Sequence, residues 1–366
     1  MQFLGQAKPP VGIVFDSDMG SSIDGALALA LLYGFDGKNE ARVVSVSVSR
    51  ANLSSAAYCE AVGRFYAGAV NGSFAGAGLG RNLPVGLAVN GKTRDETPML
   101  AVPLAKMTSD GKPMYVHGIH QLNDTAEVPA LIRNAFSSQY DQNSIAILVG
   151  PATNFAQVLD LPGFKDLVSR KCRFLAMTGG AFPDGKPEFN IETDIPAARK
   201  LFAEWPTPIV ISGSEIGEAL PFPAASIEKD FAWSPAHPVV DAYEAYKAMP
   251  YDAPSGDMST VLYAIHSQDG YFKLSDPGTI TVLDDGRTKF TPSPQGKHRY
   301  LIVDPAQKEK IIKVYTEVAS AKPVPRAPRF RQKALQEQKE KELKEKELKD
   351  KEVPIQPSEA KPPAAQ

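Results

Sequence analysis

The segment VGIVFDSDMGSSIDGALALALLYG, residues 11–34, decides the fold class. Residues 11–15 are almost wholly apolar and rich in β-branched side chains, which is typical of a buried strand in a parallel sheet. Residues 26–33 are apolar along most of their length and predict a helix. Acidic and small residues lie between the two. This order of strand, polar loop and helix is the unit from which parallel sheets are built.

The same unit recurs along the chain. Further strands are predicted at residues 42–48, 144–149, 173–177 and 208–212, and further helices at residues 54–66 and 154–159. Alternation of this kind predicts an α/β fold with a mostly parallel, Rossmann-like open sheet and helices on both faces. Polar residues gather just after the strands, at the edge where open parallel sheets bind ligands.

Two other segments have a different pattern. Residues 72–110 are rich in glycine and proline and show poor periodicity, so we expect loops with short strands there. Residues 270–303 predict a late β-rich segment, in which Asp284, Asp285 and Gly286 form a turn between two alternating runs. No internal repeat is visible.

The C-terminal end differs in composition from the rest. Residues 331–352 are almost entirely Lys, Glu, Gln and Leu, with leucines too sparse for a coiled coil, so they predict a solvated helix stabilised by i,i+4 charge pairs. Residues 353–366 are rich in proline and alanine and predict disorder. We therefore expect one domain over residues 1–325 and a tail over residues 326–366 that carries no chemistry.

Composition excludes several classes of function. The formal net charge of −2 argues against broad binding to nucleic acid, which needs a clustered basic face. Cys59 and Cys172 lie far apart in no metal-binding spacing, so we expect two buried thiols. The sequence contains no run of about 18 apolar residues, so it predicts no membrane span. Residues 1–10 do not resemble a signal peptide, which favours the cytoplasm; removal of a signal peptide would instead imply a secreted or periplasmic protein.

Three carboxylates follow the first strand within nine residues. Asp16 and Asp18 lie at its end, and Asp24 lies at the start of the next helix. Carboxylates this close repel one another unless a positive group shares the space, and a hard cation such as calcium or magnesium would suit oxygen ligands. Asp24 could instead be a helix N-cap. A haloacid-dehalogenase-type phosphatase also has an aspartate pair after its first strand, but Met19 and Gly20 fit that family poorly.

Four motifs in order resemble the inosine/uridine-preferring nucleoside hydrolase family, which comprises calcium-dependent N-ribosyl hydrolases. They are FDSDMGSSIDGALALALL at 15–32, ILVGPATNFAQVL at 147–159, MTGGAF at 177–182 with EFNIETDIPAA at 188–198, and SGDMSTVLYAI at 255–265. The resemblance spans roughly residues 11–305 and excludes the tail. It implies the nucleoside hydrolase fold and hydrolysis of ribonucleosides to ribose and free base by metal-activated water.

The resemblance also implies roles for the matching residues. Asp18 would ligate calcium and accept the proton from water, with the Asp257 carboxylate and the Val149 backbone carbonyl as further ligands. The residues that match the ribose-binding set are Asp24, Glu188, Phe189 and Asn190.

Each match has a purely structural alternative. Thr153 and Asn154 could cap the helix that follows them. Glu188 could be an exposed loop charge, and Asp257 a helix N-cap. The observation that favours the functional interpretation is that the motifs occur together and in the family's order.

The chain departs from the family pattern in its metal loop. Gly25 stands where the family has a second, adjacent aspartate that ligates calcium. Because affinity for calcium rises with the number of charged ligands, we expect weaker binding here. Asp16 or Ser22 could compensate for the loss.

A second departure concerns the leaving base. Gly256 stands where many relatives have a histidine that assists its departure, and His117 or His120 could supply a polar group near the mouth of the site. Arg50 and Asn52 follow the second strand, close to where the family places a ribose-contacting asparagine.

Two hypotheses of different class follow. The first is a working N-ribosyl hydrolase with altered metal use, whose partners are a small-molecule nucleoside and further copies of the same chain, since relatives are commonly dimers or tetramers. The second is a catalytically weak relative that binds a nucleoside-like ligand or serves as a scaffold. Gly25 is the feature that separates them.

Overall fold

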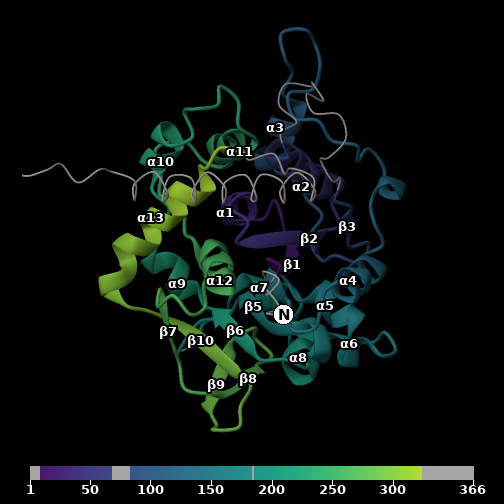
Figure 1. Ribbon diagram of the computed structural model, residues 1–366, viewed down its shortest axis with the longest axis vertical. Helices are drawn as coiled ribbons and strands as arrows, with labels where there is room; N and C mark the ends of the chain where they lie inside the picture. Colours follow the sequence, from purple (N-terminus) through teal and green to yellow (C-terminus); the bar gives the residue numbers. More distant parts are fainter. Residues whose placement is uncertain (1–8, 68–82, 184, 324–366) are drawn as a thin grey trace, which may run out of the picture. The chain divides into compact units, whose positions relative to one another are not determined.

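A computed structural model describes residues 9–67, 83–183 and 185–323 of the chain. Figure 1 shows a central sheet surrounded by helices in this part of the protein. The strands are β1 (Val11–Ser17), β2 (Ala41–Val48), β3 (Val85–Leu87), β4 (Ser144–Val149), β5 (Cys172–Thr178), β6 (Ile209–Ser212), β7 (Phe272–Leu274), β8 (Gly278–Val282), β9 (Thr288–Pro292) and β10 (His298–Val303).

The longer helices are separated from one another by strands or loops. They are α1 (Ile23–Gly37), α2 (Leu53–Tyr66), α3 (Pro98–Ala105), α4 (Val128–Ser137), α6 (Phe164–Lys171), α8 (Ile195–Glu204), α11 (Pro238–Tyr246), α12 (Gly256–Ile265) and α13 (Lys308–Ala319). Shorter ones are α5 (Thr153–Val158), α7 (Phe189–Thr193), α9 (Ser214–Ala219), α10 (Ala224–Lys229) and the 3₁₀ turns η1 (Leu122–Asp124) and η2 (Pro305–Gln307).

The sheet is mostly parallel, which confirms the predicted fold class. Its strand order is β3-β2-β1-β4-β5-β6-β10-β8-β9, with β7 paired to β10. Strands β1 to β6 pair in parallel, and β10 also runs parallel to β6. The antiparallel pairs of strands lie in the late β-rich segment, where β7 and β8 pair with β10, and β9 pairs with β8.

The chain reverses its direction of winding between β1 and β4. From β1 it moves outward through β2 to β3, and it then returns to β4 on the other side of β1. Ser17 at the end of β1 pairs with Val149 at the end of β4. Ligands of open α/β sheets bind in the crevice at such a switch point, outside the carboxyl ends of the strands. The fold therefore places the loop after β1 at the expected binding edge.

Two hydrophobic clusters cover the two faces of the sheet. Side chains of α1, α2, α11, α12 and α13 form one cluster with Ile13 and Phe15 of β1. Side chains of α4, α5, α6 and α8 form the other with Val14. Helix α1 is buried along most of its length because it packs on β2 and against α12 and α13. This burial explains why its sequence is apolar on nearly every side.

Most of the predicted elements are present with small shifts at their ends. The exception is residues 72–110: within its described part, β3 confirms a short strand, but residues 98–105 form α3, which we did not predict. Proline at its first position suits a helix start, whereas Pro103 inside it suggested a loop. Packing of Met99 and Leu100 in the core, against α2 and α11, outweighs that local preference.

Other expectations have mixed outcomes. Cys59 and Cys172 are free and buried, as predicted. Among the described residues, none of the helices has the length and apolar character needed to cross a bilayer. The predicted tail, residues 326–366, lies outside the described residues, and its charged helix remains a prediction.

The contact between α1 and α13 makes a stability prediction. A Cβ added at Gly34 would collide with the Val318 carbonyl and lie 2.8 Å from Val318 Cγ1. Because the obstacle includes backbone, we expect Gly34→Ala to lower the free energy of unfolding by about 1–3 kcal/mol, although alanine is the better helix former. Urea denaturation checks this.

Gly25→Ala is the matched control in the same helix. A Cβ at Gly25 would meet Ser17 Oγ at 3.3 Å and no backbone atom. We expect its stability to stay within about 1 kcal/mol of the native protein. Equal stability of the two variants would show that α13 does not pack on α1 as described.

Candidate functional site

Four of the predicted acidic residues meet at the carboxyl edge of the sheet. Asp18 follows β1, Asp24 lies in the first turn of α1, Glu188 precedes α7 and Asp257 lies in the first turn of α12. The three aspartates are 5–8% exposed, and Glu188 is half-buried. The negative charge of Asp18 acts on each of the other three. The fold thus collects carboxylates that are far apart in the sequence; we call these four residues the acidic group.

Burial makes ionisation of this group costly. It raises the pKa of Asp18 to about 6 and that of Asp24 to about 7, and it raises the pKa of Asp257 well above its usual value. Neighbouring carboxylates add to the effect on Asp24 and Asp257. A hydrogen bond from Ser21 and the charge of Arg50 lower the pKa of Asp18 again. Arg50 thus offsets part of the cost of burial at Asp18, whereas the neighbouring carboxylates add to that cost at Asp24 and Asp257. A cation in the same space would relieve this repulsion.

Asp24 joins two helices. Its Oδ2 accepts a hydrogen bond from the Asp257 backbone N–H at 2.7 Å, and its Oδ1 accepts one from Met258 N–H at 3.4 Å. The N-cap residue of α1 is Ser22 and that of α12 is Ser255, and neither makes a side-chain cap bond. The alternative that Asp24 or Asp257 caps its own helix is therefore wrong. Asp24 instead occupies the free N–H groups of α12, where a carboxylate is favoured by the helix dipole.

Glu188 is held by backbone rather than exposed as a loop charge. Its carboxylate accepts hydrogen bonds from the N–H groups of Gly180 at 2.9 Å, Asn190 at 3.1 Å and Ile191 at 3.3 Å. These bonds cap α7. Phe189, beside it, is 50% exposed. A fixed carboxylate next to an exposed aromatic ring is an arrangement that can hold a polar ligand with a flat group.

Thr178 at the end of β5 connects Asn190 to Asp257. Its carbonyl accepts a hydrogen bond from Asn190 Nδ2 at 3.2 Å, and its side chain hydrogen-bonds to the Asp257 carboxylate. Its hydroxyl also lies 2.8 Å from that of Thr260. Asn190 is therefore placed at the acidic group by backbone contact.

Asp16 lies under the site and is fully buried. Its Oδ2 accepts hydrogen bonds from Ser47 Oγ at 2.5 Å and Asn154 Nδ2 at 2.7 Å, whereas its Oδ1 has no partner. Burial raises its pKa to about 7. Asn154, which follows β4, therefore contacts the adjacent strand β1. The Thr153 hydroxyl donates to Asp194 at 2.7 Å. The alternative that this pair caps its own helix is wrong.

The remaining predicted residues lie at different distances from the acidic group. The Val149 carbonyl accepts the Asp18 N–H at 3.4 Å, so it lies beside the site. Asn52 caps α2 through Ser55 N–H at 3.1 Å and donates to the Arg94 carbonyl at 3.1 Å. His117 bonds to the Ile119 carbonyl at 3.0 Å and makes no hydrogen bond to the acidic group. Burial lowers the pKa of His117, and the charge of His120 adds to this.

Comparison with known proteins assigns the family. The family model described as inosine-uridine preferring nucleoside hydrolase matches residues 13–323. The chain belongs to this family. The match covers every motif on which the resemblance was based, from the loop after β1 to α12. No curated protein sequence matches the chain.

Solved structures show the same fold. A plant nucleoside hydrolase is 17% identical with a TM-score of 0.61, and the match covers 86% of this chain and all of that one. The inosine-uridine preferring nucleoside hydrolase of Bacillus anthracis is 16% identical with a TM-score of 0.59, over 85% of this chain and 99% of that one. The type III effector XopQ, solved with adenosine diphosphate ribose, is 13% identical with a TM-score of 0.60, over 86% and 96%.

The oxygen ligands that the sequence predicts for a hard cation are two carboxylates and one backbone carbonyl. In residues 9–67, 83–183 and 185–323, no three His, Cys, Asp or Glu side chains converge as a metal-holding cluster. A Cβ at Gly25 would lie 3.7 Å from Asp257 Oδ2 and 3.3 Å from Ser17 Oγ, a buried hydroxyl without a partner. A side chain at position 25, where the sequence resemblance predicts an aspartate, would therefore begin beside Asp257. Asp18, Asp257 and the Val149 carbonyl remain the predicted metal ligands.

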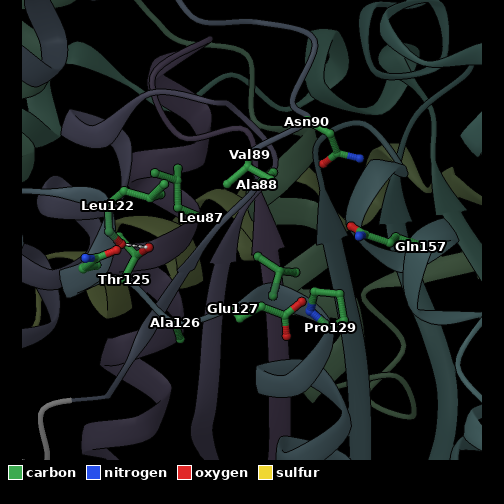
Figure 2. Close-up of a pocket in the computed structure, with 12 residues that line it drawn as sticks. Leu87, Ala88, Val89, Asn90, Leu122, Thr125, Ala126, Glu127, Pro129 and Gln157 are labelled. Atoms are coloured by element: carbon green, nitrogen blue, oxygen red, sulfur yellow. Dashed lines mark hydrogen bonds between the residues drawn. The ribbon is translucent and has the colours of Figure 1, made fainter.

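A hollow of about 390 Å³ lies apart from these residues (Figure 2). It opens between the end of β3, the η1 turn, the start of α4 and Gln157 of α5. Asn90 and Gln157 border one side of it, and Leu122 and Thr125 the other. None of the predicted site residues lines it, so the acidic group remains the candidate active site of this family member.

Sequence reasoning undervalued one residue. Arg50 follows β2 directly, is only 4% exposed, and its charge acts on Asp18. The signal in the sequence was that Arg50 follows a predicted strand and so lies at the same sheet edge as the motif DSD at residues 16–18. Its importance depends on the parallel pairing of β1 and β2, which brings residue 50 beside the loop after β1.

Asp16 makes a pH prediction. Its folded-state pKa of about 7 exceeds the unfolded value, so the native protein gains stability from the protonated carboxyl at low pH and loses it as pH rises through 7. Asp16→Asn keeps an acceptor for Ser47 and Asn154 but cannot ionise. We expect this variant to differ little from native at pH 4 and to be more stable by a few kcal/mol, in order of magnitude, at pH 8.

Urea denaturation of both proteins from pH 4 to pH 8 measures this difference. Titration of buried histidines is common to both proteins and cancels. A difference in stability that does not change with pH would show that Asp16 does not ionise in this range.

Proposed function

We propose that the chain hydrolyses the N-glycosidic bond of ribonucleosides to ribose and free base, with water activated at the acidic group. The observation that carries this proposal is the meeting of Asp18, Asp24, Glu188 and Asp257 at the β1–β4 switch point of a nucleoside hydrolase fold. Hydrolysis of such a bond passes through a positively charged, oxocarbenium-like sugar. Closely spaced, buried carboxylates are suited to stabilise that charge.

Each residue has a role in this proposal. Asp18 accepts the proton of the attacking water, which requires the ionised carboxylate, and Ser21 and Arg50 favour that form. Asp24 and Glu188 are held by backbone N–H groups, and their remaining lone pairs accept hydrogen bonds from ribose hydroxyls. Asn190 binds a further sugar hydroxyl, and the exposed Phe189 covers the sugar or base. Asp16 lies under the group, bonded to Ser47 and Asn154, and Asn52 caps α2.

Calcium is the metal we propose, held by Asp18, Asp257 and the Val149 carbonyl. A divalent cation there supplies Lewis acidity and an anchor for water and sugar oxygens. With Gly25 in place of a carboxylate, we infer a lower affinity than a site with three carboxylates has.

Position 256, where many relatives have a histidine that assists departure of the base, is a glycine here. A Cβ built at Gly256 would lie 3.8 Å from Asp24 Oδ2, so this position adjoins the acidic group. His117 makes no hydrogen bond to that group. We therefore propose that solvent protonates the departing base, which favours bases that leave readily without an enzymic acid.

A second candidate function is that the chain is a catalytically weak member of the family, which binds a nucleoside-like ligand or serves as a scaffold. Gly25 favours it, because the family's third carboxylate is missing. The effector XopQ, which has a similar fold, was solved in complex with adenosine diphosphate ribose, and this supports ligand binding as a use of the fold.

Calorimetric titration of calcium into chelator-stripped protein tests the proposal. We expect binding in the native protein and at least a tenfold loss in Asp18→Ala, followed by release of free base from ribonucleosides by the native protein alone. Calcium binding without hydrolysis would favour the ligand-binding alternative. Equal calcium affinity of native and Asp18→Ala would refute the proposed metal site.

Restoring the missing carboxylate makes a further prediction. We expect Gly25→Asp to raise calcium affinity at least tenfold, because a third carboxylate would then begin beside Asp257. Gly25→Asn is the control of the same size without the charge, and its affinity should remain near native. If Gly25→Asp binds calcium no better than Gly25→Asn, position 25 does not face the metal.

A further inference from the structure

Arg50 is a buried cation without a carboxylate in contact. It is 4% exposed and forms no salt bridge in the part of the chain that the structure describes. Its Nη1 donates to Ser21 Oγ at 2.9 Å, and its Nη2 donates to the Asp95 carbonyl. Its Nε is buried and has no partner. A guanidinium in such a place needs negative charge nearby to offset its burial.

The charge of Arg50 acts on the carboxylate of Asp18. A Cβ at Gly20 would lie 3.5 Å from Arg50 Nε, so the guanidinium lies against the loop that follows Asp18. That loop is closed by a hydrogen bond from Ser21 N–H to the Asp18 carbonyl at 3.0 Å. Arg50 is also the positive group whose charge acts on the Asp18 carboxylate.

Ser21 links the two side chains. Because a guanidinium has only donors, the Ser21 oxygen must accept from Arg50, which leaves the hydroxyl proton to point elsewhere. The Ser21 side chain hydrogen-bonds to Asp18. The proton is therefore donated to the Asp18 carboxylate. Arg50 orients Asp18 through Ser21 while it contributes positive charge to the same carboxylate.

A divalent cation at Asp18 would meet this charge. Two cations that share one carboxylate repel each other, and within a buried site water screens that repulsion poorly. The loss of a carboxylate at Gly25 and the presence of Arg50 both make the acidic group less negative. Both changes weaken the attraction for a metal.

We propose that Arg50 is a fixed internal cation of the acidic group, which orients Asp18 through Ser21 and competes with a divalent metal for its charge. The inference rests on the metal-dependent function proposed above. Arg50 is a positioning residue, since it acts through Ser21 and Asp18 rather than on the substrate. Its charge sets how tightly the site holds calcium.

Calcium titration of two Arg50 variants tests the proposal. Arg50→Gln keeps a donor for Ser21 but removes the charge, and we expect it to bind calcium at least tenfold more tightly than native. Arg50→Lys keeps the charge, and we expect its affinity to remain within about threefold of native. Both are measured by calorimetry on chelator-stripped full-length chain, with circular dichroism to confirm folding.

A second measurement follows the thermal stability of the variants instead of the heat of calcium binding. Without metal, Arg50→Gln should be less stable than native because the carboxylates lose their internal cation, and saturating calcium should raise its melting temperature by more than that of native. A merely structural role would lower stability without raising the affinity for calcium.

The outcomes separate this inference from the proposed function. Calcium binding by native protein with equal or weaker binding by folded Arg50→Gln overturns the inference and leaves the function standing. Binding by Arg50→Gln but not by native supports the inference. Binding by neither overturns both. If Arg50→Gln does not fold, Arg50→Lys decides: an affinity more than tenfold from native shows that the geometry of Arg50, and not its charge, controls the site.

Discussion

The hydrogen bonds from the first turn of α12 to Asp24 hold the candidate site together. Asp257 N–H approaches Asp24 Oδ2 at 2.7 Å, which joins the helix after the first strand to a helix more than 200 residues later. This bond satisfies N–H groups that a helix start leaves free, and it places the Asp257 carboxylate beside Gly25. The same contact supplies local stability and the geometry of the acidic group.

That geometry carries an electrostatic cost. Asp16, Asp18, Asp24 and Asp257 are all buried, and burial raises the pKa of each. A cluster of this kind persists because the rest of the fold stabilises it: β1 is buried along its whole length between β2 and β4, and α1 is covered by α12 and α13. A buried acidic group that weakens stability near neutral pH is typical of a functional site. Here the compensation comes in part from Arg50.

The two positions at which the sequence was expected to depart from the family pattern both adjoin the acidic group. A Cβ at Gly25 would lie 3.7 Å from Asp257 Oδ2, and a Cβ at Gly256 would lie 3.8 Å from Asp24 Oδ2. In the proposed reaction Gly25 concerns the metal and Gly256 the leaving base, while Glu188, which is held by three backbone N–H groups, is proposed to bind the sugar. In that proposal the groups that hold a ribose are more complete than those that cleave the bond.

The sequence by itself determined the fold class, and it proposed the residues of the site. Apolar runs that end in polar residues predicted the strands, and the order of the motifs predicted which carboxylates meet, because parallel strands present their carboxyl ends at one edge. What the sequence could not determine is how each side chain is held. The bond from Asn154 to Asp16, the cap of α12 by Asp24 and the position of Arg50 against the loop after β1 join residues that are distant in the chain. Helix α3 formed despite Pro103 for the same reason. Local patterns describe a residue's neighbours along the chain, whereas burial, charge and hydrogen bonding depend on neighbours in space, and only the tertiary structure decided those.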